Sequence, residues 1–367
     1  MKESRLKYIF YLCSAILLFL MLLNSRDAGV TCDEVLHYNH SVSVYNYFAS
    51  HGADRSALNT PVTHLQYYGQ SYDNIVTIII KWFHIDDIYG FRHIMSVIAG
   101  WLVILCTALF AVWLTGYRAG ILVLILFALS PGFIGHTVNN LKDIPFALGY
   151  IASTFFILKF LVSERKISAV EIILLTASIT FSISIRAGGL LLLCYLLFFF
   201  FLFCLFKYLK NNIIDYSEIG RKLFWITSIT LTSWILSIIL WPYALQSPVK
   251  NVLESYQVMA HFPDTFRQIF EGKVEWSDYM PWYYLPKSML ITIPIIVLIG
   301  LALFSFSVRG NNFFAGTITS NSCFPSGNSV SGSNDLIISV NSCLFSMFWI
   351  IRATFQLNLL HQKVNHL

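Results

Sequence analysis

Charged residues are scarce in this sequence, and its cysteines form no recognisable pattern. Asp, Glu, Lys and Arg make up 12% of the 367 residues, about half of the roughly 25% found in soluble domains. That scarcity, together with a hydrophobic content of 56%, excludes a soluble globular enzyme, a disordered protein and a fibrous one. The seven cysteines include no CxxC pair, so they give no disulfide framework.

Long apolar runs fill much of the chain instead, and several approach the ~20 residues that a helix needs to cross a bilayer. The first run, 8–23, follows a basic N-terminus and precedes no small-residue cleavage site, so we expect a retained helix rather than a signal peptide. The sequence therefore predicts an all-α polytopic membrane protein with about eight or nine transmembrane helices. The further expected spans are approximately 96–114, 119–133, 144–161, 168–185, 187–206, 223–242, 289–307 and 336–351.

The placement of Lys and Arg orients these helices. If the N-terminus is cytoplasmic, the inside segments hold 12 Lys and Arg in 42 residues, against 10 in about 130 residues outside when Arg186, at an outer boundary, is included. This is the bias that the positive-inside rule requires. Thirteen of the 19 Asp and Glu then lie outside. The inside segments are 1–7, 115–119, 159–167, 207–222 and 308–312; the outward ones are two large loops carrying amphipathic helices, about 24–95 and 243–288, and a short loop, 131–143.

The chain is expected to divide into three parts. Residues 1–308 form the transmembrane core, 309–335 form a linker rich in Ser, Asn and Gly, and 336–367 form a short last apolar helix with a tail. The net charge of +5 is spread along the sequence. It therefore gives no reason to expect nucleic-acid binding.

Two adjacent carboxylates, Asp33 and Glu34, follow the first apolar run by about ten residues. A carboxylate at the membrane surface can act as a general base, and its neighbour can hold a metal ion or a hydrogen-bond partner. The same residues also suit a solvated helix start, because Thr31 and Asp33 are good N-caps. One face of the same expected helix could present Asp33, His37 and His40, and the two histidines are either metal ligands or ordinary interfacial residues.

A second polar group precedes the expected span that begins near Pro145. His136, Asn140, Lys142 and Asp143 lie close together in a short outer turn. Helix capping alone would explain Asp143. Lys142 and a helix N-terminus would also favour an anion such as phosphate.

Arg186 lies between two apolar runs and before Gly188 and Gly189. An ionisable residue at membrane depth indicates function, and the planar guanidinium suits a phosphate with two contacts. The alternative is an interfacial arginine that extends to water. Trp282 and Tyr283 precede a late span, as an interfacial belt or as the lining of a carbohydrate or lipid groove.

In this order the motifs resemble the membrane glycosyltransferases of the C superfamily that use polyprenol-phosphate sugars. They are most similar to the family-39 protein O-mannosyltransferase-like enzymes and the aminoarabinose-transferase group. The resemblance covers roughly residues 5–305. Members of the family continue with more helices, so it implies a truncated or divergent C-terminus here. The matching residues are Asp33 and Glu34, His136 with Asn140 to Pro145, Arg186 to Gly189, and the stretches 270–273 and 280–286.

The resemblance implies sugar transfer from a polyprenyl phosphate to a protein, lipid or glycan acceptor on the outer face of the membrane. The location it favours is the inner membrane of a bacterium, with a periplasmic active site; a eukaryotic ER membrane, with a luminal site, stays open as the alternative. A divalent cation at Asp33 and Asp143 is a further expectation. The implied site comprises the catalytic carboxylates Asp33, Glu34 and Asp143 and the substrate-binding residues Lys142, Arg186, His136, Asn140, Arg92, Tyr68, Trp282 and Tyr283.

Two other classes of protein remain open on the sequence. A catalytically inactive membrane scaffold fits the abbreviated C-terminal region. A transporter fits less well, because charged residues would line a path through its spans, and here the polar residues gather in the expected outer loops.

Overall fold

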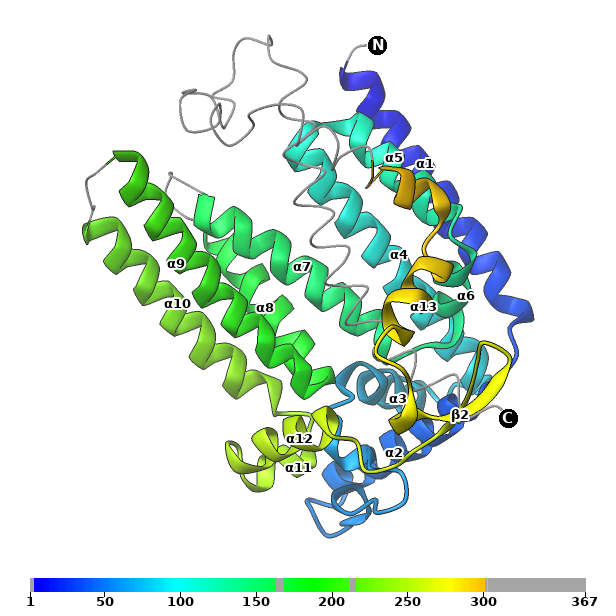
Figure 1. The fold of residues 1–367 in the computed structure, drawn as a ribbon. Helices are drawn as coiled ribbons and strands as arrows, with labels where there is room; N and C mark the ends of the chain where they lie inside the picture. The colour runs from blue at the N-terminus through cyan, green and yellow to red at the C-terminus, as the bar shows by residue number, and fades with distance from the viewer. Residues whose placement is uncertain (1–2, 163–167, 212–215, 301, 303–367) are drawn as a thin grey trace.

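The computed structural model describes residues 3–162, 168–211, 216–300 and 302, and this part of the chain is mostly helical. Long helices form a bundle, and α1 runs along one side of it (Figure 1). The sequence-based prediction of an all-α protein is therefore confirmed. The long helices are α1 (Glu3–Asn24), α4 (Ile88–Thr115), α5 (Tyr117–Ala128), α7 (Asp143–Val162), α8 (Ala169–Ile185), α9 (Leu191–Asn211) and α10 (Tyr216–Ser237).

Shorter elements connect the long helices, and two of them form a small antiparallel hairpin. Strand β1 pairs with β2 in a register that sets Arg267 opposite Trp276. The short elements are α2 (Cys32–Ala49), α3 (Ser71–Phe83), α6 (Pro131–Asn139), α11 (Pro242–Gln246), α12 (Lys250–Ala260), β1 (Arg267–Phe270), β2 (Lys273–Trp276) and α13 (Tyr284–Thr292).

Four helices of the described part are long and apolar enough to cross a membrane, and a bent pair would make five. They indicate a membrane protein. The count differs from the eight or nine expected, in part because α8 is shorter and α10 carries Glu218, Arg221 and Lys222 in its first turns. The expected linker 309–335 and last span 336–351 lie outside the described residues. The four are Glu3–Asp27, Ile88–Thr115, Asp143–Val162 and Ala187–Leu209.

The expected span 119–133 is broken rather than continuous. Helices α5 and α6 meet at an angle of 75°, and α6 begins at Pro131. Proline has no backbone N–H to continue the preceding helix, but it suits the first turn of a new one. The expected turn 131–143 is consequently a nine-residue helix followed by a short connection.

Two apolar clusters hold the long helices together. Phe10, Ile104 and Leu124 join α1, α4 and α5. A larger cluster, which includes Phe146 and Leu175, joins the four helices α7, α8, α9 and α10. A third apolar cluster connects the two halves, since Ala99 and Val103 of α4 pack on Ile144 and Ala147 of α7.

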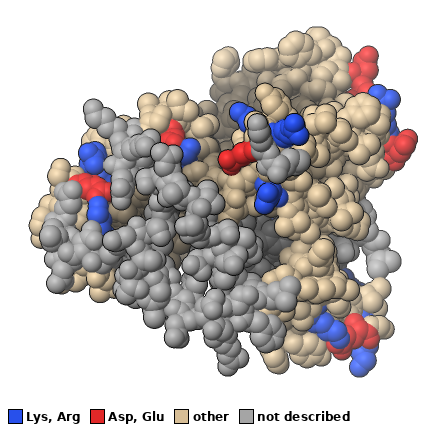
Figure 2. All heavy atoms as spheres, turned by 90° about the horizontal axis from the view of Figure 1, so that it is seen from above, with Lys and Arg blue, Asp and Glu red and all other residues tan. Residues whose placement is uncertain are grey.

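Four of the short helices, α2, α3, α11 and α12, gather at one end of the bundle (Figure 1). Glu3, where α1 begins, lies at the opposite end. Seen from above, the described residues visible at that opposite end have their acidic and basic side chains in a few small groups among uncharged residues (Figure 2). The polar residues singled out in the sequence lie at the end that carries α2 and α3.

Candidate functional site

Helix α2 begins with a capping box that uses Glu34. The Thr31 hydroxyl accepts from the Glu34 backbone N–H at 3.4 Å, and the Glu34 carboxylate accepts from the Thr31 N–H at 2.8 Å. Both contacts satisfy backbone donors that a helix start leaves unpaired. Glu34 is 3% exposed, so this carboxylate has a structural role.

The buried face of α2 is unusually polar. Glu34, His37, Ser41 and Val44 recur at helical spacing and are all buried, and His40 lies beside them. Asp33, which was expected to share a face with the two histidines, lies at the edge and keeps a side-chain exposure of 19%. Of the two adjacent carboxylates, Asp33 is the accessible one.

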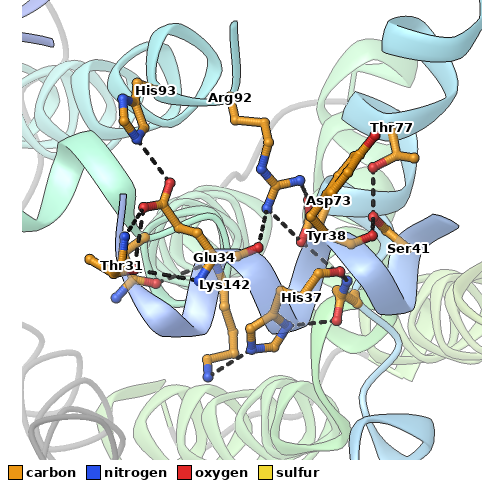
Figure 3. A network of polar contacts seen from close by, with 12 residues as sticks. Thr31, Glu34, His37, Tyr38, Ser41, Asp73, Thr77, Arg92, His93 and Lys142 are labelled. Atoms are coloured by element: carbon orange, nitrogen blue, oxygen red, sulfur yellow. Dashed lines mark hydrogen bonds and ion pairs between the residues drawn. The ribbon is translucent and has the colours of Figure 1, made fainter. Parts of the chain in front are cut away.

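Two buried contacts tie α2 and α3 to the start of α4 (Figure 3). The Arg92 guanidinium forms an ion pair with Asp73, and both side chains are buried. His93 Nε2 lies 3.0 Å from the second oxygen of Glu34. A buried cation or carboxylate needs such a partner. Arg92 therefore holds α3 against α4 and is not exposed to bind an anion.

A chain of hydrogen bonds continues from Asp73 toward the surface. Gln70 Nε2 donates to Asp73 Oδ2 at 3.1 Å and to the His37 carbonyl at 2.8 Å. His37 Nδ1 lies 2.6 Å from Gln70 Oε1, and its Nε2 lies 3.2 Å from Lys142 Nζ. Burial and the nearby Lys142 charge hold the pKa of His37 well below its usual value.

At the start of α7, Asp143 pairs with Arg186 from the end of α8. Its Oδ1 lies 2.8 Å from the Arg186 guanidinium, and its Oδ2 accepts from the Asn140 amide at 3.1 Å. Asn140 Oδ1 accepts from the Asp143 N–H at 2.7 Å. Asp143 is 1% exposed and Arg186 is 7% exposed. A carboxylate at a helix N-terminus, paired with an arginine, is electrostatically favourable.

Tyr68 contacts both cations of the site. Lys142 Nζ is 5.4 Å from the centre of its ring, and the Arg186 guanidinium carbon is 5.2 Å from it. Lys142 Nζ is also 4.0 Å from Asp33 Oδ2. Asp33, Lys142, Tyr68, Arg186 and Asp143 therefore meet in one place, although they come from distant parts of the sequence.

The remaining predicted site residues lie elsewhere or contribute indirectly. Trp282 is 87% exposed and Tyr283 is 38% exposed. The Tyr283 ring packs on Phe270 of the hairpin and on the neighbouring Trp282, so these aromatics pack against the hairpin and each other rather than against the Asp33 group. His136 belongs to α6 and is half-buried.

The carboxylates of this site do not fit a resident metal ion. In the described part of the chain, no group of three or more His, Cys, Asp and Glu side chains could hold one. Asp143 is engaged by Arg186 and Asn140, and Lys142 lies beside Asp33. A divalent cation would have to compete with these cationic groups.

Sequence reasoning missed Gln70 and gave Asp73 and His93 no role in the site. It considered His37 only as a metal ligand or an interfacial residue. A signal was present for Asp73, because this acidic residue recurs at helical spacing with the apolar Val76 and Ile80, on the buried face of α3. Gln70 gave no comparable signal in the sequence. Its backbone is left-handed, with φ of 51°, and its contacts with His37 form only when the chain folds.

Comparison with models of protein families, with curated proteins and with solved structures gives no match to this chain. Its function is therefore inferred from the residues of the site and from the motif resemblance.

Proposed function

We propose that this chain transfers a sugar from a polyprenyl-phosphate donor to an acceptor at the outer face of the membrane. The observation that carries the proposal is the meeting of Asp33, Lys142, Tyr68 and Arg186 at the end of an apolar helix bundle. A lipid-linked sugar phosphate requires an apolar environment for its tail and cations for its phosphate. In this chain the cations lie at the end of the apolar bundle.

In the proposed reaction, the Asp33 carboxylate acts as general base. It takes the proton of an acceptor hydroxyl while the hydroxyl oxygen bonds to the sugar carbon, and the bond from that carbon to the phosphate oxygen breaks. Lys142 stabilises the charge that develops on the departing phosphate, with Arg186 beside the same Tyr68 ring. The partial exposure of Asp33 supports this assignment, because Glu34 and Asp143 are buried in contacts of their own.

The proposal also includes the location of the site. The four spanning helices, the Lys and Arg distribution and the motif resemblance support a bacterial inner membrane, with the N-terminus cytoplasmic and the α2 and α3 end periplasmic. We keep the expected eight or nine spans as part of this proposal.

Transfer of radiolabel tests the proposal. The purified full chain in liposomes should move label from a defined polyprenyl-phosphate sugar to an acceptor extract, and Asp33→Asn should not. No transfer with a panel of hexose and pentose donors would contradict it.

A catalytically inactive scaffold is the second candidate, and one observation favours it. Arg92 and Arg186 each already have a buried carboxylate partner, in Asp73 and Asp143, as expected for a structural network. Equal complementation of a deletion strain by wild type and Asp33→Asn would support this candidate.

A further inference from the structure

Lys142 is held by a pair of buried residues that the sequence motifs do not include. The hydrogen-bond pattern around Gln70 fixes the orientation of its amide. The NH2 group donates to the His37 carbonyl and to Asp73, and in the flipped orientation the amide oxygen would face two acceptors. Gln70 Oε1 is therefore the atom that meets His37 Nδ1, at 2.6 Å.

This orientation determines the tautomer of His37. Nδ1 must carry the hydrogen, because Gln70 Oε1 can only accept. The lone pair of a neutral imidazole is then on Nε2, which lies 3.2 Å from Lys142 Nζ. An ammonium group has three donors and no acceptor, so Lys142 donates to Nε2 and the imidazole stays neutral.

We propose that His37 and Gln70 are positioning residues that hold the Lys142 ammonium beside Asp33 and the Tyr68 ring, where it meets the phosphate of a lipid donor. The naming of phosphate as the ligand rests on the proposed function, whereas the positioning rests on geometry alone. His37 is 7% exposed and Gln70 is 2% exposed. Their contacts place the donor atoms of Lys142 before any ligand arrives, which is the arrangement that electrostatic stabilisation of a phosphate requires.

Gln70 anchors the pair to the frame of the bundle. Its backbone N–H donates to the Ile185 carbonyl at 3.1 Å, next to Arg186, and its side chain reaches Asp73, the partner of Arg92. A non-glycine residue at φ of 51° persists where several surrounding contacts determine its conformation. Gln70 has such contacts on both its backbone and its side chain.

The test measures how fast an amine-acylating reagent modifies Lys142 at one fixed pH near neutrality, by peptide mass spectrometry on the full chain in detergent. His37→Asn keeps an amide near the position of Nδ1 but offers Lys142 no acceptor. His37→Gln extends an amide oxygen toward the position of Nε2, where it can accept from Lys142. His40→Asn is the matched control, since His40 is buried in the same helix and its Nδ1 has no hydrogen-bond partner. Exposed Lys81 is the internal reference.

Modification of Lys142 should be about fivefold or more faster in His37→Asn, because the ammonium loses its acceptor and becomes accessible. His37→Gln and His40→Asn should resemble wild type. Wild-type labelling in His37→Asn, or fast labelling in His37→Gln, would overturn the proposal. Modification of the buried Lys222 would reveal global unfolding. If His37→Asn unfolds by this criterion, His37→Met replaces it, because methionine has a similar volume and no nitrogen acceptor.

A transfer assay on the same variants separates this inference from the proposed function. His37→Asn should lower kcat for transfer about tenfold and change the apparent KM for the lipid donor less, because Lys142 acts on charge that develops only as the phosphate departs. Absence of transfer in the wild type contradicts the proposed function and leaves the labelling result to decide the positioning. Normal labelling with active transfer contradicts the positioning alone.

Discussion

Arg186 follows the last residue of α8, and its guanidinium contacts three side chains from other parts of the chain. It pairs with Asp143 and lies over the rings of Tyr68 and Phe146. The sequence offers no neighbouring acid for this charge, and the structure supplies one from α7. Arg186 therefore has a structural role in addition to the phosphate contact that we propose for it.

Arg186→Lys separates these two roles. Lysine keeps a cation that can pair with Asp143 but cannot lie flat on Tyr68 or present a two-pronged donor. We expect a roughly tenfold increase in the apparent KM for the donor with little loss of thermal stability.

Arg186→Ala should instead destabilise the protein by about 3–5 kcal/mol, because it leaves the buried Asp143 without its partner. The double variant with Asp143→Ala should recover part of that loss. A donor titration of Arg186→Lys that matches wild type would support a purely structural arginine.

Asp33→Asn tests the general base. The side chains have the same size, and Asp33 is partly exposed, so the fold should be unaffected. Transfer should fall by about 10²–10⁴-fold, the contribution of a positioned base. Near-normal turnover would move the role to Glu34 or Asp143, and Glu34→Gln is the matched variant for that comparison.

At the scale of elements, the segment before α3 is attached to the end of α8. Tyr68 and Arg186 form an isolated antiparallel bridge, and the hydroxyls of Ser71 and Ser184 lie 2.6 Å apart. Gly69 permits this approach, because a Cβ there would lie 2.1 Å from the Ser184 carbonyl oxygen. The position of Tyr68 beside the two cations depends on this contact.

Gly69→Ala should disrupt the attachment. The added methyl group meets backbone atoms, which cannot move independently of α8, so we expect a loss of about 1–3 kcal/mol, measured as a fall in Tm in detergent. Gly29→Ala is the control, since nothing lies within 4 Å of a Cβ there. Equal Tm values for the two variants would contradict the role of this contact.

The buried face of α2 predicts a dependence of stability on pH. Burial lowers the pKa of His40 from 6.5 to about 4, so the unfolded chain binds a proton at His40 more readily than the folded one between these values. Stability is then lost as pH falls from 6.5 toward 4, by up to about 3 kcal/mol at this site. His40→Gln should flatten part of that loss in denaturation curves measured across the range, and an unchanged pH slope would contradict it.

At the scale of the whole molecule, the first expected outer loop and the segment after α10 lie together. The Trp241 indole donates to the Gln66 carbonyl at 2.9 Å, and the Asn74 amide donates to the Leu240 carbonyl at 3.0 Å. His64 Nε2 lies 3.5 Å from Asp264. Segments almost two hundred residues apart in sequence thus enclose the same end of the bundle.

The orientation of that end can be measured with a native cysteine. Cys32 is exposed beside Asp33, so a membrane-impermeant maleimide should modify it in intact cells. Cys32→Ser should remove that modification and identifies it among the other cysteines. Modification of Cys32 only after the membrane is made permeable would place the α2 and α3 end in the cytoplasm and contradict the proposed site.

The sequence by itself determined the helical class, the apolar bundle and the residue types of the site. Apolar runs near twenty residues fold as helices because an apolar environment offers no other partner for their backbone groups. Pro131 and the capping box of Thr31 and Glu34 are local signals of the same kind, since each depends on neighbours a few residues away.

The tertiary structure alone decided which charges are paired and which are accessible. Nothing near Arg186 in the sequence predicts Asp143 as its partner, and nothing near Lys142 predicts His37. These contacts arise where α2, α3, α7 and α8 meet, and each buried charge there is stable only with a partner from another element. Local pattern carries no information about such pairings, because they depend on how distant segments pack.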